Sequence, residues 1–211
     1  MNPVPVSDVS RETIEAVYRA FNKNIHVFAR LIDYWLSWNK KVNLFSRGVS
    51  AADLENHITH SLFLCFIYRS ELSSPIIDAG SGGGLPGIPM AVTNSDIRFY
   101  LVEKVLKKHL VQKDVLRKFH LNNVVPICSD ISSFQLNEPV RIVSKHAFPV
   151  GRLLAAVSHL PWCEITMLKG DDYESEISDQ MHTLYSFHAS RLDISHTFFH
   201  NKYLLSIQRN S

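Results

Sequence analysis

A glycine-rich segment carries the clearest chemical signal in the sequence. Residues 80–87 read Gly-Ser-Gly-Gly-Gly-Leu-Pro-Gly, directly after the short apolar run 75–79 and before a stretch typical of a helix. Glycines at such a turn allow a sharp bend, and they let a ligand lie directly against backbone N–H groups at the helix N-terminus. The segment therefore predicts a ligand-binding loop between a strand and a helix.

Two classes of ligand fit glycines at this spacing. A dinucleotide fingerprint, G-x-G-x-x-G, can be placed on Gly82, Gly84 and Gly87, but Pro86 then removes an N–H group that a pyrophosphate needs. The other pattern is an acid followed by alternate glycines, which is typical of Rossmann-like domains that bind S-adenosylmethionine. In this chain that pattern falls on Asp78, Gly80, Gly82 and Gly84.

A carboxylate at the expected distance favours the second pattern. The apolar run 99–103 predicts the next strand, and it ends in Glu103. In Rossmann-like domains an acid at the end of the second strand hydrogen-bonds the ribose hydroxyls of the bound nucleoside. Glu103 therefore favours S-adenosylmethionine as the ligand. A tight turn that holds no ligand, with Glu103 as a surface carboxylate, is the alternative.

Strands and helices alternate around these residues. Apolar runs predict five strands, at 75–79, 99–103, 124–128, 141–144 and 164–168. The stretches between them predict helices, at 86–92, 106–119 and 151–160. This alternation predicts an α/β fold with a mainly parallel sheet. In the tail, runs 192–195 and 203–207 flank a turn at 200–202, and they predict an antiparallel C-terminal hairpin at the sheet edge.

The first 70 residues predict a helical extension. Ser10 can cap a helix, a break is expected near Asn22 or Asn24, and a further helix is expected over 51–68. Apolar residues recur there at three- and four-residue spacings, at Ile14, Val17, Tyr18, Phe21, Ile25, Phe28, Ile32 and Trp35. We therefore expect an N-terminal helical cap over 1–70 and a Rossmann-like domain over 71–211.

Composition limits the class of protein. The chain has 211 residues, 45% of them hydrophobic and 20% charged, with a net charge of +2, so it is neither disordered nor fibrous. Its longest apolar run, 62–68, is too short to cross a bilayer, and the first ten residues do not resemble a secretory signal. Three scattered cysteines, Cys65, Cys128 and Cys163, predict reduced thiols and a cytoplasmic protein.

The chain resembles the ribosomal RNA small subunit methyltransferase G family, also called glucose-inhibited division protein B. The similarity runs from about residue 30 to the end of the chain, and its most specific part is Gly-Leu-Pro-Gly-Ile-Pro at 84–89. The motifs occur in the family's order: Trp38-Asn39-Lys40 with Asn43-Leu44, His57-Ile58 with Ser61-Leu62, residues 78–89, Glu103 followed by basic residues, Ser144-Lys145 and Leu168-Lys169-Gly170.

This resemblance implies a class I methyltransferase that uses S-adenosylmethionine to methylate N7 of a guanine in small-subunit (16S) ribosomal RNA. Together with the loop pattern, it gives the expected cofactor-binding residues as Asp78, Gly80, Ser81, Gly82, Leu85, Glu103, Ile131, Ser132 and Lys145. The sequence departs from the family at His60, where an aspartate is usual, and at Ser132, where a glutamate is usual. It also reads Ser144-Lys145-His146-Ala147 where the family usually has Ser-Arg-Ala, so either Lys145 or His146 takes the place of the arginine.

The reaction that the resemblance implies needs no catalytic base. Guanine N7 carries an exposed lone pair, and no proton leaves before the methyl group is attacked, so positioning and electrostatics suffice and no catalytic residue is assigned. Alternatives are a diverged methyltransferase with another target and a non-catalytic RNA-binding relative, with a dinucleotide oxidoreductase as a more distant third.

Basic residues supply the expected contacts with RNA. Lysines that neutralise phosphates release counterions, although a solvated helix face is an equal alternative for the lysines after Glu103. The candidates for RNA binding are Lys104, Lys107, Lys108, Lys145 and Lys169. We expect His57 to shape the pocket, no membrane contact, a monomer, and ribosomal RNA or a ribosomal particle as partner. The spacing of His57, His60 and Cys65 lacks a second pair of ligands, so no metal is expected.

Overall fold

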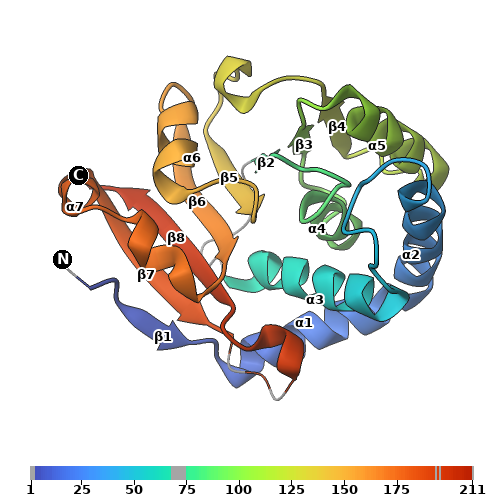
Figure 1. The fold of residues 1–211 in the computed structure, drawn as a ribbon, viewed down its shortest axis with the longest axis horizontal. Coiled ribbons are helices and arrows are strands. Elements are labelled where there is room, and N and C mark those ends of the chain that lie inside the picture. Colours follow the sequence, from blue (N-terminus) through green and yellow to red (C-terminus); the bar gives the residue numbers. More distant parts are fainter. Residues whose placement is uncertain (1–2, 68–74, 193, 195, 211) are drawn as a thin grey trace.

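A central sheet organises the chain (Figure 1). The computed structural model describes residues 3–67, 75–192, 194 and 196–210, which form a sheet of eight strands in the order β1-β7-β8-β6-β5-β2-β3-β4. Their bounds are β1 Val6–Asp8, β2 Ile76–Ala79, β3 Phe99–Val102, β4 Val124–Ile127, β5 Val140–Lys145, β6 Trp162–Lys169, β7 Tyr185–Arg191 and β8 Tyr203–Arg209. The five strands predicted between residues 75 and 168 are thus confirmed to within two residues at either end.

The sheet is parallel except at β8. This strand lies between β6 and β7 and runs antiparallel to both. The predicted hairpin exists, but the prediction of its first strand at 192–195 was wrong: β7 ends at Arg191, and positions 193 and 195 lie outside the described residues. Leu192 instead packs into the core after the strand. The three-residue β1, which pairs in parallel with β7, was not predicted because each of its side chains is exposed.

Helices connect the strands and cover both faces of the sheet. They are α1 Arg11–Lys23, α2 Ile25–Asn39, α3 Ala51–Ile67, α4 Gly87–Thr93, α5 Leu106–Phe119, α6 Val150–Ala156 and α7 Asp179–Leu184, with 3-10 turns η1 Ile131–Ser133, η2 Asp171–Glu176 and η3 Thr197–Phe199. The predicted bounds of α5 are confirmed. α6 ends four residues before the predicted Leu160, and the last predicted residue of α3, at position 68, lies outside the described residues.

Successive residues of a strand face opposite sides of the sheet, so each strand contributes to two layers of core. Ile76 packs in the layer that includes α2, α3 and α5, whereas the next residue, Ile77, packs in the layer with α6. In β6, Leu168 likewise packs in the first of these layers and Met167 in the second. The result is a three-layer α/β arrangement, in which the rigid sheet holds the ends of its strands in fixed positions.

The first three helices pack on one face of the sheet. Phe28 and Trp35 of α2 are fully buried in the same core as Ile76 of β2, and Figure 1 shows α1 and α3 side by side. Ser10 caps α1 by accepting a hydrogen bond from the Thr13 N–H at 3.2 Å, and Asn24 separates α1 from α2, as predicted. Among the described helices, none is long and apolar enough to cross a bilayer. The domain boundary at 70/71 stays a prediction, because residues 68–74 are outside the described part of the chain.

Candidate functional site

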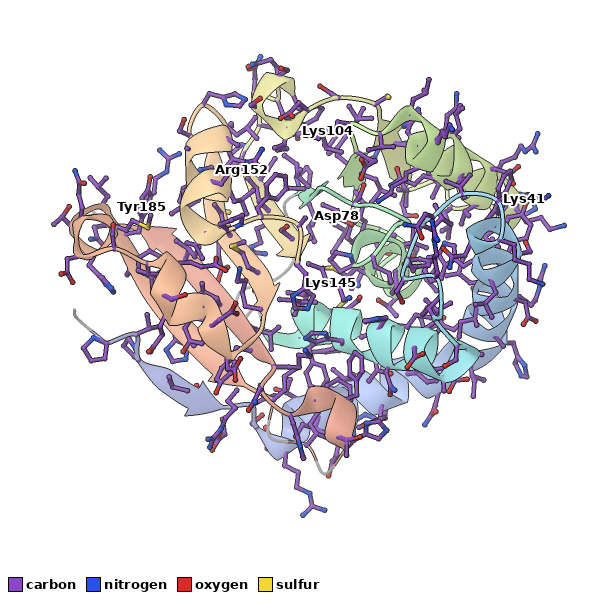
Figure 2. The ribbon with its side chains drawn as sticks, in the orientation of Figure 1. Lys41, Asp78, Lys104, Lys145, Arg152 and Tyr185 are labelled. Carbon is purple, nitrogen blue, oxygen red and sulfur yellow. The ribbon has the colours of Figure 1, made fainter. Side chains whose placement is uncertain are left out.

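A cavity of about 880 Å³ opens where β2, β3, β4 and β5 end. In open parallel sheets a ligand binds outside the carboxyl ends of the strands, where the chain changes direction along the sheet. Here β2 is that point, because β3 flanks it on one side and β5 on the other. Figure 2 shows Asp78, Lys104 and Lys145 around this central region, whereas Lys41 and Tyr185 lie at opposite edges of the molecule.

The cavity has two ends, which we name by their residues. The loop end consists of residues 80–83 and Leu85 together with Glu103 and residues 129–132. The histidine end consists of His57 of α3 and of Lys145 and His146 at the end of β5. Phe45 and Phe148 also line the cavity, and the sequence analysis named neither of them.

Backbone geometry at the loop end requires glycine. Gly80, Gly82 and Gly84 have φ values of +70°, +54° and +103°, which residues with a side chain rarely adopt. A Cβ atom on Gly80 would lie 2.8 Å from both the Ala147 Cβ and the Phe148 ring. The loop therefore packs directly against the segment that follows β5, and it brings bare backbone to the cavity wall.

Glu103 lies at the end of β3 and lines the cavity next to the loop. Its side chain is buried, and its oxygens accept hydrogen bonds from the Gly82 N–H at 2.9 Å and the Val105 N–H at 2.8 Å. A carboxylate has about four lone-pair positions, so two backbone donors leave capacity for two more. These contacts orient the carboxylate and leave it able to accept the two hydroxyls of a ribose, so the residues present fit S-adenosylmethionine.

Asp78 lies beneath the loop. It is fully buried, it does not line the cavity, and it accepts a hydrogen bond from the Gly87 N–H at 2.8 Å. Burial raises the pKa of this carboxyl to about 7, against the lowering effect of the Gly87 hydrogen bond. The structure thus places Asp78 as an anchor for the far side of the glycine loop.

The remaining residues predicted to contact the cofactor line the cavity. Ser81 and Leu85 are buried parts of the loop, Ile131 is a buried wall residue, and Ser132 is exposed at the rim. Asp130 holds the rim by accepting a hydrogen bond from the Ser132 N–H at 3.1 Å. Every residue predicted to bind the cofactor, apart from Asp78, is therefore at this one cavity.

Gln112 supports the loop from α5, and the sequence analysis did not identify it. Its Nε2 donates hydrogen bonds to the Ser81 Oγ and the Gly82 carbonyl oxygen, both at 2.8 Å. The side chain is fully buried. The sequence does contain a sign of this role: Gln112 lies next to Val111 and three residues before Val115, so it falls on the apolar face of a helix that is otherwise polar.

Cationic and imidazole groups gather at the histidine end. The Lys145 ammonium lies 3.0 Å from the His57 Nδ1, and the ring of His57 meets Phe198 edge-on at 5.1 Å. Burial, followed by the charge of Lys145, lowers the pKa of His57 to about 4, and the same two causes lower the pKa of His146 to about 4. Burial, together with the Lys202 charge, lowers the pKa of Lys145 to about 8. At neutral pH these imidazoles are therefore uncharged and weakly basic.

His60 lies behind this end, fully buried, with its pKa well below the usual value because of burial. Cys65 makes its polar contacts with Thr93 and Asn94. Its sulfur lies 3.6 Å from the Thr93 hydroxyl and accepts a hydrogen bond from the Asn94 side chain at 3.3 Å. Within the ranges that the structure describes, no group of three or more histidine, cysteine or acidic side chains is arranged to hold a metal ion.

Three lysines follow Glu103 at the mouth of the cavity. Lys104 and Lys108 line it, and Lys107 is exposed one position before Lys108. The Lys104 ammonium lies 3.6 Å from the Asp130 carboxylate. Both side chains are about half exposed, so this contact restrains the Lys104 side chain only weakly. The mouth of the cavity is thus basic on the β3 side.

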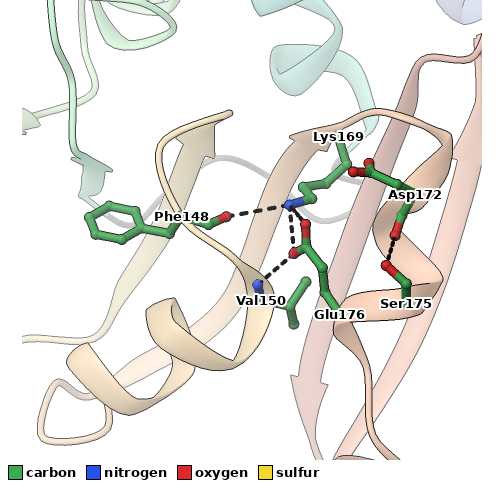
Figure 3. Close-up of polar contacts among 6 residues, drawn as sticks. All are labelled: Phe148, Val150, Lys169, Asp172, Ser175 and Glu176. Atoms are coloured by element: carbon green, nitrogen blue, oxygen red, sulfur yellow. Dashed lines mark hydrogen bonds and ion pairs between the residues drawn. The ribbon is translucent and has the colours of Figure 1, made fainter.

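Lys169 differs from these lysines because its charge is already matched. Figure 3 shows its ammonium between the Glu176 carboxylate, with both oxygens at 2.5–2.6 Å, and the Phe148 carbonyl oxygen at 3.4 Å. Glu176 also accepts a hydrogen bond from the Val150 N–H at 2.7 Å. Lys169 is buried and does not line the cavity. The contact ties β6 to η2 and α6, and the burial and pairing of the Lys169 ammonium argue against the predicted contact of Lys169 with RNA.

Comparison with known proteins gives a consistent result. A family model described as rRNA small subunit methyltransferase G matches residues 24–204. A ribosomal RNA small subunit methyltransferase G from Chlorobium phaeobacteroides is 30% identical over 155 residues, which cover 71% of this chain and 70% of the relative. The protein of the same name from Chlorobium limicola is 27% identical, over 95% of this chain and 93% of its own length.

Solved structures share the fold at lower sequence identity. An S-adenosylmethionine-dependent O-methyltransferase from Thermotoga maritima superposes with a TM-score of 0.55 and 14% identity, covering 84% of this chain and 71% of its own. A precorrin-6y C5,15-methyltransferase from Geobacter metallireducens gives a TM-score of 0.51 and 16% identity, covering 65% and 80%. These matches confirm the predicted Rossmann-like methyltransferase fold.

Proposed function

Because the chain belongs to the rRNA small subunit methyltransferase G family, we propose that its cavity performs the reaction for which that family is named. The enzyme is an S-adenosylmethionine-dependent methyltransferase that modifies N7 of a guanine in small-subunit ribosomal RNA. The observation that carries the proposal is the oriented carboxylate of Glu103 beside a glycine loop, in one cavity with Lys145.

The loop end is suited to the methyl donor. We assign the ribose to Glu103, the methionine portion to the bare backbone of Gly80 and Gly82, and the adenine to the wall at Ile131 and Ser132. When bound, S-adenosylmethionine supplies an electrophilic methyl group on a positively charged sulfur. Asp78 and Gln112 keep the loop in shape from below and from α5.

The histidine end is suited to an acceptor that brings its own lone pair. Guanine N7 loses no proton on methylation, so a strong base is not required there. The lowered pKa values of His57 and His146, about 4 for each, make both imidazoles poor bases at neutral pH. The chain therefore acts by holding the two reactants in line, which is an effect of positioning.

The basic mouth of the cavity is suited to the RNA backbone. Lys104 and Lys108 line the cavity and Lys107 is exposed beside Lys108, and we assign to these three lysines the phosphates that flank a nucleotide in the cavity. Each neutralised phosphate releases counterions, so binding should weaken as salt is raised. We propose that a monomer acts in the cytoplasm on ribosomal RNA or on a ribosomal particle.

Methyl transfer to RNA tests the proposal. Small-subunit RNA that lacks base methylation, and small subunits assembled from it, would be incubated with S-adenosylmethionine carrying a tritiated methyl group. The labelled nucleoside would then be identified after digestion and its position mapped. We expect 7-methylguanosine at a single site. Transfer to an exocyclic amine would contradict the assignment to N7, and tight RNA binding without transfer would identify a non-catalytic relative.

A further inference from the structure

The Lys145 side chain presents hydrogen-bond donors at the histidine end of the cavity, and such donors distinguish guanine from adenine. We infer that the Lys145 side chain reads O6 of the target guanine, and that His57 positions Lys145 for this contact. The inference rests on the proposed function and deepens it, because it assigns base selectivity to one side chain. It makes Lys145 a specificity-determining residue and His57 a positioning residue.

The position of Lys145 follows from the ends of two neighbouring strands. The Ser144 Oγ donates a hydrogen bond to the Ala79 carbonyl oxygen at 3.0 Å, and this contact joins the end of β5 to the end of β2 immediately before the glycine loop. Lys145 is the next residue, and its side chain lines the same cavity as Gly80. With the nucleoside of the donor assigned to the loop end, we assign the β5 side of the cavity to the acceptor. The inference therefore moves Lys145 from the predicted cofactor contacts to the acceptor base.

His57 fixes the amine of Lys145 without neutralising it. The Lys145 Nζ lies 3.0 Å from the His57 Nδ1. The pKa of His57 is lowered to about 4, so the ring is uncharged at neutral pH, and because an ammonium group can only donate, Nδ1 is the acceptor in this contact. An ammonium group has three N–H donors, so this contact leaves two. In the described part of the chain, no carboxylate forms an ion pair with Lys145, which distinguishes it from Lys169.

The two free donors match one edge of guanine. Guanine presents two acceptors, N7 and O6, on the edge that carries the methylation site, whereas adenine presents N7 beside an N6 amino donor. A lysine amine close to N7 therefore donates to O6 of guanine and faces a second donor in adenine. An unmade hydrogen bond at a buried polar group is costly, so the mismatch selects against adenine.

The surroundings of Lys145 are compatible with the charge of the product. N7 methylation places a positive charge on the base. Burial, followed by the charge of Lys202, lowers the pKa of Lys145 to about 8, with Asp78 acting in the opposite direction. The amine is thus close to losing its proton, and a neutral amine still donates a hydrogen bond to O6.

The test removes the O6 atom from the RNA and the amine from the protein. The methylated guanosine, mapped as described above, is replaced by the ribonucleoside of 2-aminopurine, which keeps N7 and lacks O6, by ligation into full-length small-subunit RNA. Initial rates of transfer and, without the methyl donor, dissociation constants are measured for both RNAs. We expect wild-type enzyme to favour guanosine by about tenfold or more in rate, with a weaker preference in the same direction in binding.

The variants assign that preference to Lys145. Lys145→Met keeps the length of the side chain without its donors, and we expect the preference to fall below about twofold in both measurements. His57→Phe removes the acceptor and keeps a ring against Phe198, so the preference should fall substantially. His57→Asn restores an acceptor near Nδ1 and should recover it. Lys23→Met, an exposed lysine in the last turn of α1, is the matched control and should retain the wild-type preference.

The outcomes separate the inference from the proposed function. If wild-type enzyme methylates both RNAs equally, or if Lys145→Met keeps the wild-type preference in binding, the inference is overturned while the methyltransferase assignment stands. If wild-type enzyme transfers no methyl group to guanosine RNA, the proposed function itself fails. For a variant too slow to assay, the binding preference measured without the methyl donor decides.

Discussion

The two ends of the cavity are built in different ways. The loop end comes from one part of the chain, between residues 80 and 132, and its polar contacts include those of the Glu103 carboxylate with the Gly82 and Val105 N–H groups. The histidine end brings together α3, the end of β5 and the segment before β8, through contacts such as that between His57 and Lys145. A binding site for a common cofactor can thus be local in sequence, whereas the site for a particular acceptor depends on distant parts of the fold.

The two ends also carry opposite kinds of buried ionisable group. Asp78 under the loop has a raised pKa, whereas His57, His60 and His146 have lowered pKa values. In every case burial is the largest cause, and it favours the uncharged form. At neutral pH the three imidazoles are therefore uncharged and Asp78 is only partly ionised, and variants can separate their contributions.

The largest expected effect on cofactor binding is at the loop itself. Gly80→Ala places a Cβ atom 2.8 Å from Ala147 and Phe148 at a φ of +70°. We expect the affinity for S-adenosylmethionine, measured by calorimetry, to fall by about 100-fold or more, equivalent to about 3 kcal/mol. The matched control is Gly48→Ala, where an added Cβ meets nothing within 4 Å. An affinity within about threefold of wild type for Gly80→Ala would show that the loop does not bind the cofactor.

Asp78→Asn tests the anchor beneath the loop. The pKa of Asp78 is about 7 in the folded protein, above the ordinary value of 3.8, so the folded state holds the proton more tightly than the unfolded state does. This group therefore destabilises the wild type progressively as pH rises from about 4 to 7. The variant lacks that ionisation, so its free energy of unfolding should rise relative to that of the wild type over this window, by up to about 4 kcal/mol.

Urea unfolding at several pH values measures this difference. The histidines with lowered pKa values act in the opposite direction, because they destabilise the folded state as pH falls from about 6.5 to 4. They are present in both proteins, so they cancel in the comparison between wild type and Asp78→Asn. A difference that stays constant between pH 4 and 8 would contradict the buried, raised-pKa description of Asp78.

Glu103→Gln should have a smaller effect on cofactor binding. The amide keeps one acceptor oxygen, but its NH₂ group cannot accept a backbone hydrogen bond, so either Gly82 or Val105 loses its partner. We expect S-adenosylmethionine to bind about tenfold more weakly, with little change in melting temperature. Glu138→Gln, at an exposed position away from the cavity, controls for the loss of a charge. Equal affinity of the two variants for S-adenosylmethionine would contradict the assignment of the ribose to Glu103.

The smallest expected effect is at the mouth of the cavity. Replacing Lys104, Lys107 and Lys108 together by alanine should weaken RNA binding about fivefold near physiological salt and lower the slope of log affinity against log salt by about 2. Cofactor affinity should not change.

The matched control uses the last two turns of the same helix. Lys113, Arg117 and Lys118 carry the same total charge and lie outside the cavity lining. Their replacement by alanine should leave the affinity and the salt slope within about a third of wild type. If both triple variants weaken RNA binding equally, the lysines act through net charge and not as part of a defined surface.

Local patterns predicted the loop end well. The glycines and Glu103 were identified because strand, turn and helix follow each other within a few residues, where residue type directly limits backbone conformation. The bounds of α5 and the five central strands were predicted for the same reason. Asp78 was predicted to contact the cofactor, but no sequence pattern distinguishes a carboxylate in the loop from one buried 2.8 Å from the Gly87 N–H beneath it.

The features that the sequence did not predict depend on contacts between different elements of the fold. Lys169 was expected to contact RNA, but Glu176, seven residues later, turns back to pair with it in the interior. Pairing of β1 with β7 joins residues more than 180 positions apart, and Gln112 reaches the loop across about 30 positions. The amine of Lys145 and the ring of His57, which are 88 positions apart, meet only because α3 packs against the end of β5. Such contacts depend on the whole fold.

The central claim is that one cavity holds the methyl donor at its loop end and the acceptor base at its histidine end. The most direct test is a crystal structure of the protein with S-adenosylmethionine. We predict ribose hydroxyls within hydrogen-bonding distance of Glu103, and the sulfonium sulfur between Gly80 and Lys145. Density for the nucleoside at any other surface, or a ribose with Glu103 turned away from it, would contradict the account.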